Sequence, residues 1–234
     1  MPDRRDFLTA MAMLSMNAEA DQDSIYIPER QLEKDRSTIV DFMDEFSFAM
    51  IVTGKNGIHI TNVPTVYTRT PEGWGKVWFH ISRNNKQNAA LDGSTESIIV
   101  FHGPHGYISP NWYNAKNAVP TWNFAVVHAT GKPKLVEDDA EFAAGLKRLV
   151  DRNEGKYGGG TAWEYAKLPD EYLKGMRKGI NGYEMVIESV EAKFKMGQDA
   201  PAATKELILK GLKSGRKERG LYEYTEAYYE KKKT

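Results

Sequence analysis

The 234-residue chain has no cysteine and no excess of either charge. The lack of cysteine excludes disulfides, thiolate nucleophiles, cysteine-ligated zinc and iron–sulfur clusters. Lys and Arg together number 32, as do Asp and Glu, so the formal net charge is zero. That balance argues against nucleic-acid binding over the whole surface, although a local basic patch is compatible with it. No apolar run approaches the roughly 18–20 residues that a membrane-spanning helix needs, so we expect no membrane partner.

The common catalytic motifs are also missing. The sequence has no G-x-S-x-G, no Walker-type loop, no G-x-G-x-x-G and no H-E-x-x-H, and no spacing of carboxylates nominates an acid–base pair. The catalytic residues therefore stay unknown. What is present is an apolar fraction of 41% and an aromatic fraction of 11%, with 5 Trp and 12 Tyr. Such rings pack β-structure and can line a pocket for a flat ligand.

The N-terminus has features of a targeting segment. Arg4 and Arg5 precede Phe7 and Leu8, and a modest apolar run ends at 18–20 in a small-x-small pattern. This segment resembles a twin-arginine export signal, which would make the protein periplasmic. The alternative is an amphipathic N-terminal helix on a cytoplasmic protein.

Hydrophobic periodicity predicts short helices between several antiparallel strands. Asn56-Gly57 is a strong hairpin signal, and Pro64 suggests an edge or a bulge in its strand. We expect 103–120 to be a long irregular functional loop and 213–234 to be a charged peripheral tail. The fold class is mainly β with helices (α+β), a small β-barrel with helical decoration. The expected helices are 37–48, 84–91, 138–152, 170–177 and 201–212, and the expected strands are 49–53, 58–67, 77–81, 97–102, 121–130 and 183–194.

The most informative local unit is the run from Phe79 to Gln87. A strand ends, Ser82 and Arg83 follow, and Lys86 lies in the first turn of the expected helix. A helix N-terminus offers free N–H groups and the positive end of its dipole. Together with these side chains it predicts a site for a phosphate monoester. A solvated turn with an ordinary cap is the plainer interpretation.

Two further units carry aromatic and imidazole side chains. In FHGPHGYISPNWY, His102 and His105 are three residues apart, but Gly103 and Pro104 make a helix there unfavourable, so we assign no metal. In VPTWN, strand geometry would direct Trp122 and Asn123 to opposite faces, so that one of them could line a pocket.

These motifs resemble the PaiB-type family of FMN-binding negative transcriptional regulators. The residues that carry the resemblance are FHGPHGYISPNWY, VPTWNFAVVHATGK, HISRNNKQ, GYEMVIESVEAKFKMGQ and IYIP at 25–28. The resemblance covers about 25–212. It divides the chain into an N-terminal extension (1–24), one domain (25–212) and a tail (213–234).

The resemblance implies an FMN-binding split β-barrel, related to pyridoxamine-phosphate-oxidase-like flavoproteins. It also implies a homodimer with FMN at the interface. The phosphate would lie at the Ser/Arg/Lys cluster, and the aromatic units would lie on the isoalloxazine side. The residues that it nominates for cofactor binding are His80, Ser82, Arg83, Asn85, Lys86, Gln87, Trp112, Tyr113, Trp122 and Asn123.

The chain departs from the family pattern at two places. Asn62 replaces a histidine in the family's N-H-x-P, and Ala200 replaces an arginine in its S-Q-N-R. If those residues serve the ligand, its affinity or identity differs here.

Three functions are compatible with the sequence. A flavin-dependent redox or flavin-carrier role needs no conspicuous catalytic side chain, because the flavin supplies the chemistry. Transcriptional repression, the role in the family's name, would require DNA binding, which the net charge does not favour. Haem binding is the third, with His59, His80, His102, His105 or His128 as the axial ligand.

Overall fold

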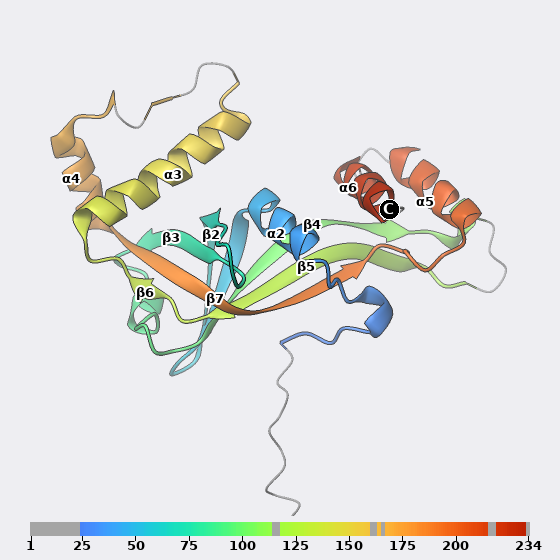
Figure 1. The fold of residues 1–234 in the computed structure, drawn as a ribbon, viewed down its shortest axis with the longest axis horizontal. Helices are drawn as coiled ribbons and strands as arrows, with labels where there is room; N and C mark the ends of the chain where they lie inside the picture. Colours follow the sequence, from blue (N-terminus) through green and yellow to red (C-terminus); the bar gives the residue numbers. More distant parts are fainter. Residues whose placement is uncertain (1–23, 114–117, 160–162, 165–166, 215–218, 233–234) are drawn as a thin grey trace, which may run out of the picture.

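Seven antiparallel strands form the centre of the molecule in the computed structural model (Figure 1). It describes residues 24–113, 118–159, 163–164, 167–214 and 219–232, so the proposed export signal lies outside the described residues. The order is β3-β2-β1-β4-β5-β7-β6, and an additional β3–β7 pairing closes the barrel. The strands are β1 (Phe48–Gly54), β2 (Ile58–Thr68), β3 (Lys76–Ser82), β4 (Ser97–Ile108), β5 (Thr121–Gly131), β6 (Lys134–Leu135) and β7 (Ile180–Lys195).

Alternation along the strands separates an apolar interior from the outer face. In β1, Ala49 and Ile51 are buried in the core, whereas Phe48 on the other face is 70% exposed. The expected hairpin joins β1 to β2, with Asn56 and Gly57 at positive φ values of 52° and 119°. This is the conformation that Asn-Gly adopts readily.

Strand β2 changes its partner at Pro64. Residues up to Pro64 pair with β1, and the pairing with β3 begins at Thr65, opposite Phe79. A proline fits this point because it has no N–H to donate to a ladder. The last residues of β3, from His80 to Ser82, pair with β7 but not with β2. The barrel therefore opens beside the end of β3.

The longer helices lie at the ends of the barrel. Figure 1 shows α3 and α4 at one end, α5 and α6 at the other, and α2 between them. No helix in the described part of the chain is both long and apolar enough to cross a membrane. The helices are α2 (Arg36–Glu45), α3 (Asp139–Tyr157), α4 (Asp170–Gly179), α5 (Ala202–Ser214) and α6 (Arg219–Lys231), and the short 3-10 turns are η1 (Glu29–Gln31), η2 (Lys86–Ala89) and η3 (Pro110–Trp112).

The expectation of an irregular loop over 103–120 is wrong in its first part. Strand β4 continues to Ile108, and β5 pairs with it along its length, with a register shift between His102 and His105. Gly103 and Pro104 weaken a local strand signal, but a bulge accommodates them once a long partner strand is available. The result is an arm of β4 and β5 that extends toward α5 and α6 (Figure 1).

The expectation of a peripheral C-terminal tail is also wrong. Helix α6 places Leu221, Tyr228 and Tyr229 in the main core, where Leu221 is only 1% exposed. The charged side chains that dominate this segment occupy the other positions of an amphipathic helix. The composition of the segment therefore does not reveal the apolar face of the helix.

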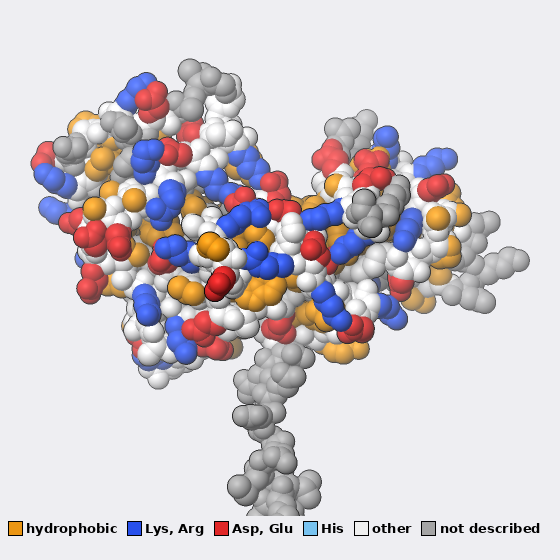
Figure 2. Space-filling model, viewed as in Figure 1, with side chains coloured by type: hydrophobic (Ala, Val, Ile, Leu, Met, Phe, Trp, Pro, Cys, Tyr) orange, Lys and Arg blue, Asp and Glu red, His pale blue; other side chains and the backbone are white. Residues whose placement is uncertain are grey.

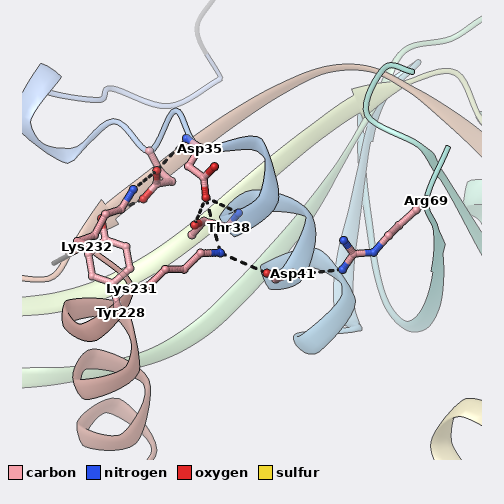
Figure 3. Close-up of polar contacts among 8 residues, drawn as sticks. Asp35, Thr38, Asp41, Arg69, Tyr228, Lys231 and Lys232 are labelled. Carbon is pink, nitrogen blue, oxygen red and sulfur yellow. Dashed lines mark hydrogen bonds and ion pairs between the residues drawn. The ribbon is translucent and has the colours of Figure 1, made fainter. Parts of the chain in front are cut away.

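Charged contacts join α6 to α2 (Figure 3). Lys231 Nζ lies 3.6 Å from Asp35 and 3.3 Å from Asp41, and Asp41 also pairs with Arg69 at 2.7 Å. Hydrogen bonding from Thr38 lowers the pKa of the Asp35 carboxyl, which caps α2. This network ties the last helix of the chain to its first long helix.

The face between the two helical ends carries Lys and Arg side chains interspersed with Asp and Glu (Figure 2). Most of the basic side chains near α2 are already paired with carboxylates, as Arg152 is with Asp44 and Lys156 with Glu45. This face therefore does not form a patch of one sign.

Candidate functional site

The segment after β3 is a tight turn held by asparagine side chains. Asn85 Oδ1 accepts from Gln87 N at 2.9 Å, and Asn88 Nδ2 donates to Ser82 O at 2.8 Å and to Asn85 O at 2.7 Å. These bonds compete with helical ones, so only the four-residue turn η2 forms. The predicted helix over 84–91 is therefore wrong, and a helix dipole contributes nothing to an anion site here.

Buried amide groups fix this turn to the barrel. Gln87 is only 1% exposed, and its Nε2 donates to Thr53 Oγ1 at 3.1 Å and to Ile51 O at 3.3 Å. Thr61 Oγ1 donates to Gln87 Oε1 at 2.5 Å and accepts from Asn85 Nδ2 at 2.9 Å. Gln87 and Asn85 therefore hold the turn against β1 and β2.

The turn presents two cations that no acid neutralises. Arg83 and Lys86 are exposed, and neither forms an ion pair with a carboxylate in the described parts of the chain. Arg83 makes one long hydrogen bond, from Nη2 to Arg177 O at 3.4 Å. Ser82 Oγ accepts from Asn84 N at 3.3 Å, which leaves its hydroxyl hydrogen for another acceptor. A hydroxyl, a guanidinium and an ammonium form a donor set that fits a phosphate monoester.

His80 lies next to this turn on the outer side of β3. Its Nδ1 is buried and has no hydrogen-bond partner among the described residues. Burial lowers the pKa of the His80 imidazole and so favours its neutral form. A polar molecule bound at the turn of Arg83 and Lys86 would supply the missing hydrogen-bond partner of His80 Nδ1.

The aromatic candidates lie at the far end of the β4–β5 arm. Trp112 and Tyr113 are partly buried against the core, and an added Cβ on Gly211 of α5 would lie 2.3 Å from the Trp112 ring. Trp122 is 53% exposed, whereas Asn123 is 2% exposed with an unpartnered Nδ2, so the two do point to opposite faces.

Four rings form a continuous row on the outer side of the arm. The centroids of His102 and His105 are 4.9 Å apart, those of His105 and Trp122 are 6.2 Å apart, and those of Tyr107 and Trp122 are 6.1 Å apart. Of these four residues, only Trp122 was predicted from the sequence to bind the cofactor.

One chain does not bring all the predicted residues together. His80, Ser82, Arg83, Asn85, Lys86 and Gln87 cluster at the end of β3. The aromatic candidates Trp112, Tyr113, Trp122 and Asn123 lie on the arm near α5, away from β3 (Figure 1). A single chain therefore does not place its arm at its own turn.

Sequence reasoning missed two residues that shape the turn. Thr61 bonds both Asn85 and Gln87, and Asn88 Oδ1 accepts from Asn181 Nδ2 at 2.9 Å and from the Tyr183 hydroxyl at 2.8 Å. Because these contacts join distant strands, local spacing gives no signal for them. The asparagines at 84, 85 and 88 are the one feature of the sequence that indicates a turn held by side-chain hydrogen bonds.

The two departures from the family pattern lie in different surroundings. Asn62 is exposed on the outer side of β2, next to Thr61 of the turn network. Ala200 lies in the turn after β7, where Arg30 and Asp199 approach to 3.6 Å and Gln198 Nε2 donates to Arg30 O at 2.9 Å. The Asn62 change therefore lies nearer to the cation pair.

The histidines do not converge on one point. His59 Nε2 contacts Lys55 O at 3.1 Å, and His128 Nδ1 contacts Ser24 Oγ at 2.7 Å on another strand. Within the described ranges no group of three or more His, Asp or Glu is arranged to hold a metal ion.

Comparison with known proteins identifies the family. Residues 25–189 match the family described as "Putative FMN-binding domain". The Bacillus subtilis "Protease synthase and sporulation protein PAI 2" is 31% identical over 176 residues, which cover 75% of this chain and 83% of that protein. The Saccharomyces cerevisiae "Uncharacterized protein YKL070W" is 33% identical over 105 residues, 43% of this chain and 62% of that protein.

Solved structures show the same fold. The flavocytochrome Anf3 from Azotobacter vinelandii superposes with a TM-score of 0.55 at 19% identity, covering 74% of this chain and 73% of that one. A protein from Bacteroides thetaiotaomicron described as a putative 5-nitroimidazole antibiotic resistance protein superposes with a TM-score of 0.50 at 10% identity, covering 69% and 85%. The predicted split barrel is confirmed, and the chain belongs to the PaiB-type family of FMN-binding split-barrel proteins.

Proposed function

We propose that the protein binds FMN through the turn after β3, with Ser82, Arg83 and Lys86 holding the phosphate. The observation that carries this is the pair of unpaired cations on a turn that Gln87 and Thr61 fix in place. Because the turn is already ordered, little conformational entropy would be lost when a phosphate binds. When bound, FMN supplies redox chemistry, and the chain supplies binding and orientation.

His80 would contribute a neutral imidazole to this site. With no partner for Nδ1 and a lowered pKa, the ring would hold one proton and offer both a donor and an acceptor. It would therefore orient a polar group without adding a third positive charge.

The working form that this proposal requires is a homodimer. The start of β2 is uncovered on its outer face and carries apolar side chains, and such a surface is typical of an association site. There Ile58 is 78% and Ile60 is 58% exposed. A second copy on this face would supply the arm that a single chain cannot bring to its own turn.

The role that fits these features is a flavin-dependent redox protein or a flavin carrier. The alternative role as a transcriptional regulator would need a basic surface for DNA, and the face in Figure 2 mixes charges of both signs instead. Haem would need an axial ligand, and His80, the histidine with a buried unpartnered Nδ1, lies next to the turn that the phosphate would occupy.

The test is FMN affinity in variants of the turn. Arg83→Ala and Lys86→Ala should each weaken FMN binding about tenfold, the loss of about 1.4 kcal/mol expected for one charge-assisted contact. The matched controls are Arg148→Ala on α3 and Lys210→Ala on α5, which are exposed and should bind FMN as the native protein does. Unchanged affinity in both turn variants would refute the assignment.

A further inference from the structure

A pocket with aromatic walls lies on the outer face of the barrel, beside the proposed cofactor turn. Its volume is about 530 Å³, within the range of pockets that hold small organic ligands. Four separate parts of the fold build it, namely the end of α2 with the start of β1, the middle of β2, β4 and the end of α3. The lining side chains that matter here are Phe46, Phe48, Pro64, His102, Asn153 and Tyr157.

Ion pairs hold the walls of this pocket together. Lys156 Nζ donates to Glu45 O at 3.0 Å and pairs with Glu45 Oε1 at 2.7 Å, and Arg152 Nη1 pairs with Asp44 Oδ1 at 2.6 Å. These contacts fasten the end of α3 to the end of α2. Tyr157 is thereby held at the mouth of the pocket although 69% of it is exposed.

The residues that line the pocket indicate the kind of ligand that it suits. Aromatic rings and a proline offer flat apolar surfaces, which suit a planar ring. Glu45 is the one charged residue among the described lining residues, and Lys156 already neutralises it, so the pocket favours an uncharged molecule. Asn153 Nδ2 donates to Leu149 O at 2.9 Å, so the polar groups that remain are its amide oxygen, the His102 imidazole and the hydroxyls of Ser47 and Tyr157.

The pocket and the proposed FMN site share strand β2. Pro64 of the pocket is three residues from Thr61, to which the turn is bonded. At about 3.3 Å per residue, this separation is about 10 Å. A molecule bound in the pocket would thus lie close to a cofactor held by the turn.

We propose that this pocket binds a planar, uncharged aromatic substrate of the flavin protein. The ring would lie among Phe48, Pro64 and Tyr157, and His102 would donate to a carbonyl or a similar acceptor. This inference rests on the proposed FMN function, and it adds the class of substrate to it.

The experiment measures binding of menadione, a neutral planar quinone, to FMN-saturated protein by isothermal titration calorimetry. Tyr157→Ala and Phe48→Ala should each weaken menadione binding at least fivefold and leave FMN affinity unchanged. Tyr172→Ala is the matched control, because Tyr172 is also 58% exposed but lies on α4. His102→Ala should weaken menadione more than it weakens naphthalene, which has no acceptor.

Three results would overturn the proposal. The first is no measurable menadione binding while FMN still binds, which leaves the FMN function intact. The second is equal menadione binding by native protein and both pocket variants. The third is a parallel loss of FMN affinity in both variants, because the pocket would then belong to the cofactor. If the native protein binds no FMN, the proposed function fails, and the same titration on the cofactor-free protein still tests the pocket.

Discussion

Glycine residues mark the points where aromatic rings lie against the backbone of a neighbouring element. A Cβ added to Gly145 of α3 would lie 2.3 Å from the indole of Trp78, and one added to Gly182 of β7 would lie 2.7 Å from the ring of Phe142. These close approaches bring α3 onto the outer side of β3, where Trp78 and Phe142 form a second small core. Residue size at these positions therefore decides how α3 packs.

Gly145→Ala should destabilise the protein by about 1–3 kcal/mol, because the new methyl group must displace the buried indole. Gly155→Ala on the same helix is the matched control, since nothing lies within 4 Å of its Cβ position. That substitution should stabilise the protein by up to about 1 kcal/mol through helix propensity. Urea unfolding followed by circular dichroism gives both values. Equal effects of the two substitutions would contradict the packing.

Helix α6 buries two tyrosines, Tyr228 and Tyr229, in addition to Leu221 and Thr225. Burial raises the pKa of Tyr229 from 10.0 to about 12, and burial together with Glu33 raises the pKa of Tyr228. The hydroxyl of Tyr229 donates to Met196 O at 2.5 Å, and that of Tyr228 donates to Glu33 Oε2 at 3.0 Å. The protonated phenols are therefore part of the contact between α6 and the barrel.

These pKa values predict a loss of stability at alkaline pH. Tyrosines ionise near pH 10 in the unfolded chain but only above that in the folded one. The stability they contribute is therefore complete below pH 10 and is lost as the pH rises through about 12. The guanidinium chloride concentration at the midpoint of unfolding should decrease as the pH is raised from 9 to 11. The decrease should be smaller in the double variant Tyr228→Phe/Tyr229→Phe. An equal fall in both proteins would show that these phenols do not couple α6 to the barrel.

Some of these elements could be predicted from the sequence and others could not. Local signals predicted the β1–β2 hairpin at Asn56-Gly57, and the resemblance gave the split barrel. The predictions were wrong where contacts between residues distant in the sequence determine the structure. Strand β4 continues past Gly103-Pro104 because β5 pairs with it, and α6 is buried because its tyrosines contact Glu33 and Met196. The predicted phosphate residues do cluster, but the residues that anchor them, such as Thr61, come from another strand.

For the whole molecule, the uncovered outer face predicts a dimer. Native protein should sediment at twice the 26.5 kDa mass of the chain, and Ile60→Asp should shift it to the monomer, because a carboxylate would be buried against apolar partners. Ile60 is 58% exposed in the single chain, so the substitution should leave the fold intact. Leu207→Asp, at a 39% exposed position on α5, is the control and should remain dimeric. A native monomer at tens of micromolar would contradict the dimer.

The proposed function depends on recognition of the FMN phosphate by the turn after β3. Its most direct test compares FMN with riboflavin, which has the same ring system and no phosphate, by equilibrium dialysis against the native protein. The phosphate should interact with two unpaired cations, so FMN should bind at least about tenfold more tightly than riboflavin, and added salt should reduce the difference. Equal affinity for the two flavins would place the phosphate away from Arg83 and Lys86 and would refute its recognition by the turn.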